Sequence, residues 1–166
     1  ETRRWLAAQG RESEWVCPNL SHHPAQAIQQ LSHIIETATT PPRLIGSSLG
    51  GFYATFLVAQ YNLKAVVINP AVHAAHVLRP ALNTLQSSWH GHETYTFTQQ
   101  HLDELSALEL PTPIYPDTIL LMQERGDEVL DWKQAVTYYA DCHQLVFTGG
   151  DHGFTRFKMV LGLMDD

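Results

Sequence analysis

The stretch RLIGSSLGGF, residues 43–52, limits what this chain can fold into more than any other. A short apolar run leads into a serine between glycines, and a run with helical character follows. Gly46, Ser48 and Gly50 fit G-x-S-x-G, a pattern in which a strand turns so sharply into a helix that the serine backbone is strained. Side chains two residues before and after the serine would collide with neighbouring backbone, and glycine removes both collisions. We therefore predict that the turn holds Ser48 Oγ above the carboxyl ends of parallel strands.

The surroundings of this pattern matter, because three fixed positions in five also occur by chance. The main alternative is the glycine-rich loop of a nucleotide-binding protein, but neither G-x-G-x-x-G nor G-x-x-x-x-G-K-S/T is present. Ser47 is the adjacent candidate nucleophile and lacks symmetric glycines around it. The pattern favours Ser48, with the amide of Leu49 at the helix start pointing toward a developing oxyanion.

Composition excludes several classes of protein. The chain has 166 residues, 44% of them apolar, which predicts one globular domain with a real core. Its net charge is -7, and no cluster of Lys and Arg stands out, so neither nucleic acid nor an anionic membrane is expected as the main partner. No apolar run is long enough to span a bilayer. We expect a cytoplasmic protein in which Cys17 and Cys142 are small, buried and reduced.

Helical and strand-like runs alternate along the chain, which predicts an α/β fold: a mostly parallel sheet with helices on both faces. Ala65–Pro70 is a continuous apolar run of the kind buried in such a sheet. The expected strands are 15–18, 43–46, 65–70, 118–122 and 144–147, and the expected helices are 2–8, 25–36, 49–59, 99–108, 132–139 and 155–163.

A serine nucleophile needs a base and a group that orients the base, and on this fold they follow in the order Ser, acid, His, each after a later strand. Asp127 lies in the loop after the strand 118–122, and His152 lies among glycines after the strand 144–147. The alternatives are a solvated acidic turn and an ordinary loop histidine. Rival acids in the same loop are Glu124, Glu128 and Asp131, of which Asp131 is placed to cap the next helix.

Three motifs together resemble the YqiA-type esterases, a compact branch of the α/β-hydrolase superfamily. They are GSSLGGF at 46–52, GDEVLD at 126–131 and GGDHGF at 149–154, and the resemblance covers nearly the whole chain. It implies a cytosolic serine esterase or thioesterase acting on acyl esters, including acyl-CoA, without a metal or organic cofactor. Ser48, Asp127 and His152 match the family's triad positions.

The amino terminus departs from this family. Its members open with a strand and a His-Gly-Phe-Asn-Ser-like loop that supplies a second oxyanion amide, whereas this chain starts at Glu1 inside the equivalent of the first helix. We therefore expect a compact α/β-hydrolase fold that lacks its first strand, in a piece of a longer natural protein. Loss of one oxyanion donor costs on the order of a hundred to a thousand fold in rate.

Two further signals concern the histidines and a possible lid. His73 and His76, and also His90 and His92, have spacings that a metal could use, but no cysteine pair or carboxylate completes a set, so no metal site is expected. Residues 72–110 within the single domain 1–166 form either an apolar lid over the active site or helices packed on the edge of the sheet.

The leading functional hypothesis is ester or thioester hydrolysis through an acyl-enzyme on Ser48. Transfer of the acyl group to another acceptor is the alternative within the enzyme class. An α/β-hydrolase-fold binding protein with weak or lost catalysis is the alternative from another class.

Overall fold

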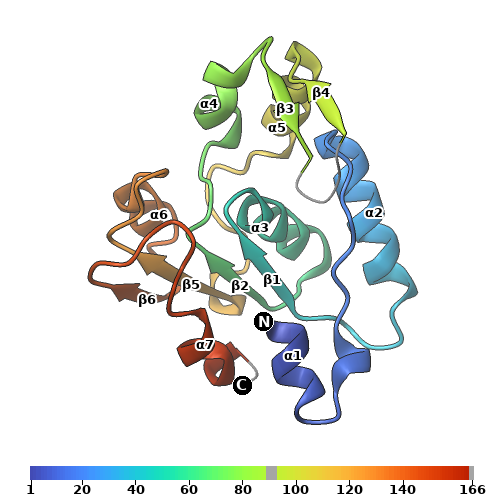
Figure 1. Cartoon of the computed structure of the whole chain (residues 1–166), viewed down its shortest axis with the longest axis vertical. Coiled ribbons are helices and arrows are strands. Elements are labelled where there is room, and N and C mark those ends of the chain that lie inside the picture. The colour runs from blue at the N-terminus through green and yellow to red at the C-terminus, as the bar shows by residue number, and fades with distance from the viewer. Residues whose placement is uncertain (89–92, 165–166) are drawn as a thin grey trace.

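A parallel sheet forms the centre of the molecule (Figure 1). The computed structural model describes residues 1–88 and 93–164. Its four-stranded sheet has the order β1-β2-β5-β6, and every pair in it is parallel. The strands are β1 (Leu44–Ser47), β2 (Ala65–Ile68), β5 (Ile119–Glu124) and β6 (His143–Phe147). The predicted α/β fold with a parallel sheet is confirmed.

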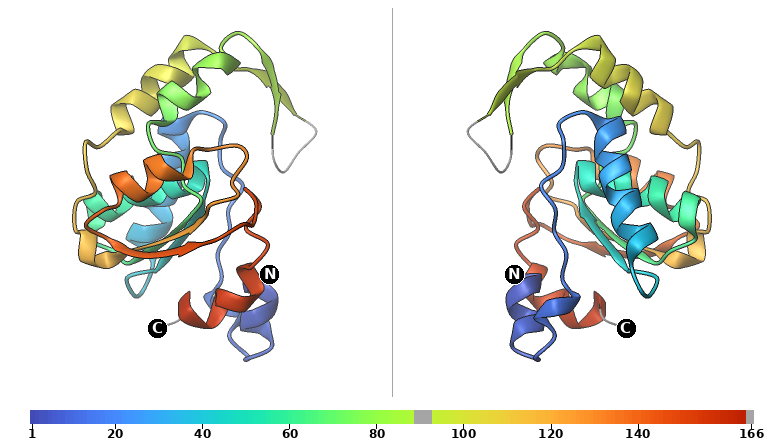
Figure 2. Two further views of the ribbon diagram at one scale, coloured as in Figure 1. Left: turned by 90° about the vertical axis from the view of Figure 1, so that its left-hand side faces the viewer. Right: turned by 90° about the vertical axis from the view of Figure 1, so that its right-hand side faces the viewer.

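The two central strands are buried on both faces, so alternate residues enter different cores. Ala65 and Val67 of β2 pack with α3 (Leu49–Tyr61) and α6 (Trp132–Tyr138). Val66 and Ile68 face the other way, toward Phe154 and toward Val160 of α7 (Phe157–Val160). Figure 2 shows α3 and α6 on one side of the sheet and α7 with α1 (Thr2–Ala7) on the other. Helices therefore cover both faces, as the continuous apolar runs predict.

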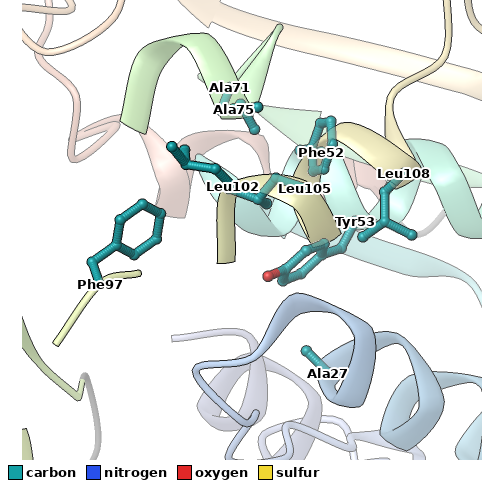
Figure 3. Close-up of a cluster of buried hydrophobic side chains, with 10 residues drawn as sticks. Ala27, Phe52, Tyr53, Ala71, Ala75, Phe97, Leu102, Leu105 and Leu108 are labelled. Atoms are coloured by element: carbon teal, nitrogen blue, oxygen red, sulfur yellow. The ribbon is translucent and has the colours of Figure 1, made fainter. Parts of the chain in front are cut away.

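Residues 72–88 and 93–110 stand over the helices on one side of the sheet (Figure 2). They contain α4 (Ala74–Leu78), the antiparallel pair β3 (Leu85–Ser87) and β4 (Thr94–Thr96), and α5 (Gln99–Leu108). Figure 3 shows the cluster that joins them to α2 (Pro24–Thr37) and α3, with Phe52 and Tyr53 meeting Leu102 and Leu105. The strands β3 and β4 project beyond this cluster, and Leu85 is 68% exposed.

Short 3₁₀ turns complete the chain at Glu12–Glu14, Arg79–Ala81, Pro116–Thr118 and Leu161–Met164. Among the described residues, no helix is both long and apolar enough to cross a bilayer.

The strand predicted at 15–18 is wrong. Val16 is 61% exposed, Cys17 is exposed rather than buried, and the segment pairs with no other strand in the described part of the chain. Three apolar residues followed by Pro18, which has no amide hydrogen, offer little to a ladder of hydrogen bonds. The closing helix is also shorter than predicted, because its last turn is 3₁₀.

Because the central strands are buried on both faces and β3 is not, truncating a leucine should lower stability far more in β5 than in β3. Leu121 in β5 is 0% exposed and Leu85 in β3 is 68% exposed. Leu121→Ala should lower the free energy of unfolding by about 2–5 kcal/mol, because it leaves a cavity in the core. Leu85→Ala should change it by less than about 0.5 kcal/mol. Urea unfolding followed by circular dichroism measures both, and equal effects would contradict the assigned strand faces.

Candidate active site

Ser48 lies at the turn between β1 and α3 with a backbone angle φ of 54°. This left-handed region is unfavourable for a serine, so neighbouring backbone must hold it there. The Ser48 amide donates to the Ile68 carbonyl at 3.0 Å, and the Ala71 amide donates to the Ser48 carbonyl at 3.0 Å. The end of β2 and the residues after it therefore fix the strained serine.

The glycines around Ser48 have different roles from those predicted. A Cβ on Gly46 would strike the Gly50 carbonyl oxygen, so the first predicted collision is real. A Cβ on Gly50 would meet nothing within 4 Å, so the second is wrong. A Cβ on Gly51 would lie 2.7 Å from Pro70 Cβ, because α3 crosses the end of β2 closely there. The helix side of the turn therefore needs glycine at 51 rather than at 50.

His152 connects Ser48 to Asp127 although the three residues are far apart in the sequence. Its Nε2 lies 3.1 Å from Ser48 Oγ. Its Nδ1 lies 3.0 and 2.9 Å from the two carboxylate oxygens of Asp127. Ser47, the adjacent candidate, ends β1 with an exposed side chain. These distances permit transfer of the Ser48 proton to the imidazole.

Asp127 is fixed by backbone amides of its own loop. Its side chain is 0% exposed, and Oδ1 accepts hydrogen bonds of 2.9 Å from the amides of Val129 and Leu130. The Val129 side chain is exposed, so the expectation that it packs beneath Asp127 is wrong. Asp131 accepts a hydrogen bond from the Lys133 amide and caps α6, as predicted.

Asn69 and Glu124 hold the His152 loop, and the sequence reasoning did not find this role. Asn69 Nδ2 donates to the carbonyls of Asp151 and His152 at 3.0 Å each. Asn69 Oδ1 accepts from the Glu124 amide at 2.9 Å. Both Asn69 and Glu124 are 0% exposed. A polar residue at the end of each buried strand, in Val-Ile-Asn and Met-Gln-Glu, was the available signal.

The Glu124 carboxylate lies under the loop rather than against the imidazole. Its Oε2 accepts from the Asp151 amide at 2.6 Å, and a Cβ on Gly150 would strike this carboxylate. Arg156 Nε lies 3.6 Å from Oε1. The rival acid Glu128 accepts a hydrogen bond of 3.0 Å from the His152 amide. Among the rivals in this loop, two therefore contact the backbone of the segment that carries His152.

The amide of Leu49 is the first of α3, with Ser48 as the N-cap. Amides in the first turn of a helix have no acceptor within the helix and favour negative charge. Leu49 N–H is therefore available to a charge that develops beside Ser48 Oγ.

A cavity of about 100 Å³ lies between the residues that follow β2 and those that follow Asp127. Its walls are both polar and apolar: the polar groups are His76, Asp131 and Gln134, and the apolar residues are Pro70, Val72, Val77, Val129, Leu130 and Ala135.

Other reactive side chains do not join this site. Burial, with the nearby Asp141 and Asp117, raises the pKa of the Cys142 thiol to about 11, so it is protonated at neutral pH. His73 Nδ1 lies 3.1 Å from Glu109 Oε1. The pair His90 and His92 lies outside the described residues.

Comparison with known proteins agrees with this fold. Residues 1–164 match the profile of a family described as "Uncharacterised protein family (UPF0227)". The resemblance to YqiA-type proteins is confirmed by this match together with the α/β-hydrolase fold of the structural neighbours.

Solved structures are similar in fold at low sequence identity. Est1E from Butyrivibrio proteoclasticus has a TM-score of 0.67 at 13% identity over 86% of this chain and 68% of that chain. The mouse alpha/beta hydrolase domain-containing protein 10 has a TM-score of 0.63 at 18% identity, over 87% of this chain and 68% of that chain. An esterase domain from Rhodothermus marinus has a TM-score of 0.59 at 18% identity, over 84% of this chain and 65% of that chain. The chain thus spans about two thirds of the length of these structures.

The contacts of the glycines predict opposite outcomes for neighbouring substitutions. Gly51→Ala should destabilise the fold by about 1–3 kcal/mol, because its Cβ meets Pro70. Gly50→Ala should leave stability unchanged or raise it by up to about 1 kcal/mol, because alanine favours a helix. Chemical denaturation of both variants measures the difference. A greater loss in Gly50→Ala would refute the assignment of the close approach to Gly51.

Proposed function

This chain belongs to the UPF0227 family, and from that premise we propose that it is a serine hydrolase of acyl esters or thioesters, with Ser48 as nucleophile. One observation carries the proposal: Ser48 Oγ lies 3.1 Å from His152 Nε2, whose ring lies against the buried Asp127 carboxylate. A hydroxyl, an imidazole and a carboxylate in this order form the group that activates serine in acyl transfer.

The first half of the reaction forms an acyl-enzyme. Ser48 Oγ attacks the acyl carbonyl while His152 Nε2 takes its proton. The tetrahedral intermediate collapses, and His152 returns the proton to the departing alcohol or thiol. In the second half, His152 takes a proton from water, the hydroxide attacks the acyl group, and Ser48 regains its proton as the acid leaves.

Asp127 acts on the imidazole. Because its carboxylate faces Nδ1, the ring proton is held there and Nε2 is left free to accept. The amides of Val129 and Leu130 keep the carboxylate oriented when the imidazolium forms. Leu49 N–H donates to the oxyanion, and its fixed place at the start of α3 requires no reorganisation during the reaction.

The cavity beside the Asp127 loop, with its polar and apolar walls, supports a small acyl or leaving group as the substrate portion bound there. Val72 and Val77 border it, so residues 72–110 contribute one wall in the manner of a lid. A relative in fold, Est1E, has been solved with ferulic acid bound, which supports an ester of a small organic acid as the substrate class. Apolar contacts select chain length only weakly, by about 1–3 kcal/mol per methylene.

The nucleophile is tested with a fluorophosphonate probe, which labels activated serines. Ser48→Ala should abolish labelling and lower the hydrolysis of p-nitrophenyl esters by at least about a thousandfold, because no other group replaces the hydroxyl. Ser47→Ala is the matched control and should retain labelling. Absence of labelling in the folded protein, with any natural flanking residues included, would refute the proposal and favour a binding protein.

The acid is tested by two substitutions in one loop. Asp127→Asn should lower kcat by on the order of 10⁴-fold, since an amide favours the wrong imidazole tautomer. Asp131→Asn, which changes a helix cap and one polar group of the cavity, should retain most of kcat, with any effect confined to KM, because Asp131 does not contact His152. Ester hydrolysis under saturating substrate, with circular dichroism to verify folding, distinguishes the two. Equal losses would show that Asp127 has only a structural role.

A further inference from the structure

Three histidines gather away from the Ser48 site, where the segment before α2 meets α5. His22 and His23 precede α2, and His101 lies in the first turn of α5. One ring nitrogen from each lies within 4.8 Å of the others. Two of these histidines are adjacent in the chain, whereas the third is almost eighty positions away, so the fold alone brings the group together.

Two nitrogens of this cluster are buried without a hydrogen-bond partner. They are His23 Nδ1 and His101 Nε2, and His101 itself is only 2% exposed. Buried polar atoms are nearly always satisfied, so two orphaned nitrogens on neighbouring rings mark a place where a ligand would find partners. His101 Nδ1 is already used in the capping box of α5, where it accepts a hydrogen bond of 3.0 Å from the Thr98 amide and lies 2.8 Å from Thr98 Oγ1.

A carboxylate lies beside one of these histidines, His23. Glu104 follows His101 by three positions, so both side chains lie on one face of α5. Glu104 Oε1 lies 3.6 Å from the orphaned His23 Nδ1. Its Oε2 accepts from the Ala25 amide at 3.1 Å, and its Oε1 accepts from Gln100 at 2.8 Å, so the carboxylate is already oriented.

We propose that His22, His23, His101 and Glu104 bind one divalent transition-metal ion of the zinc type. Imidazole nitrogens with one carboxylate oxygen are a ligand set that such ions prefer, and four ligands suit the tetrahedral geometry of Zn²⁺. The site uses none of Ser48, Asp127 or His152. It therefore stands apart from the proposed hydrolysis.

The charge states of the ligands suit a cation. Burial, together with the neighbouring His23 and His22, lowers the pKa of His101, which favours the neutral form that a metal requires. Burial opposes the charge of Glu104, but hydrogen bonds from the Ala25 amide and Gln100 and the nearby histidines lower its pKa overall. Glu104 therefore supplies the one negative charge of the site.

Binding requires the rings to turn. His23 and His101 are stacked with centroids 4.4 Å apart and an angle of 10° between the rings, and His22 stacks on Tyr95 at 4.1 Å. Convergence on one ion requires His22 and His23 to rotate about their side-chain bonds, and the exposed position of His22 leaves its ring room to do so. Binding of the ion by His101 Nε2 requires the ring proton to move to Nδ1, which exchanges the hydrogen bond from the Thr98 amide for one to the Thr98 hydroxyl.

The ion would tie α2 to residues 72–110. His22 and His23 belong to the amino-terminal part of the chain, whereas His101 and Glu104 belong to α5. These elements already meet through the hydrogen bond from the Ala25 amide to Glu104 and through the apolar cluster that contains Ala27, Tyr53 and the α5 leucines (Figure 3). We expect metal binding to raise the melting temperature and to leave Ser48 chemistry in place.

The test titrates metal-free protein with Zn²⁺ by calorimetry, and with Co²⁺ by visible absorption. We expect one ion per chain and an intense Co²⁺ band typical of tetrahedral coordination. The double variant His22→Asn with His23→Asn should weaken binding by more than the roughly 10- to 100-fold that loss of an outer hydrogen-bond partner costs. Glu104→Gln should weaken it as well.

His33→Asn is the matched control, because His33 is exposed on α2 and lies outside the cluster. It should bind Zn²⁺ like the parent chain, and so should Ser48→Ala. Zn²⁺ should raise the melting temperature of these controls but not that of the double variant, whose changes lie at a helix start rather than in the core. Absence of saturable binding, or binding that survives the double substitution, would overturn the proposal.

Discussion

The backbone of Ser48 is the constraint on which the rest of the site depends. A serine with φ of 54° carries backbone strain of about 1–3 kcal/mol, and contacts with the surrounding sheet must offset this strain. Hydrogen bonds to Ile68 and from Ala71 connect this residue to the end of β2, and Gly46 and Gly51 allow α3 to approach that closely. The same turn sets the direction of α3 and makes Leu49 N–H the first amide of that helix. The strain is therefore distributed over a turn, a neighbouring strand and a helix start.

The position of His152 depends on a buried carboxylate rather than on its own loop. That loop is rich in glycine and has no strong conformational preference of its own. Hydrogen bonds between its backbone and the side chains of Asn69 and Glu124, which lie beneath it, fix its conformation. Burying a carboxylate is costly unless several donors satisfy it. Here the Asp151 amide and the nearby Arg156 guanidinium offset part of that cost. Buried polar side chains under the loop thus hold it in one conformation, although its own residues are flexible.

The sequence predicts an element well where its hydrophobic pattern is strong, and poorly where the element forms only if it pairs with another strand. Continuous apolar runs identify β2 and β5, and the sequence predicts the bounds of α5 as they occur. Residues 15–18 look equally apolar but find no strand to pair with, which local pattern does not reveal. The order Ser, Asp, His predicts which residues meet, because parallel strands end at one edge of the sheet. The roles of Asn69, Gly51 and the histidines near α2 depend on contacts between distant segments, so the sequence alone did not indicate them.

The polar residues at the ends of β2 and β5 have a consequence for how the sheet assembles. When strands are apolar on both faces, their side chains specify the register only weakly, because a slip by one residue still buries apolar side chains. In this sheet a slip would separate the Asn69 amide from the Met122 carbonyl and the Glu124 amide from Asn69 Oδ1, leaving uncompensated polar groups in the core. Asn69 and Glu124 therefore select one alignment among near equals. The residues that position His152 also specify the register of the strands that carry it.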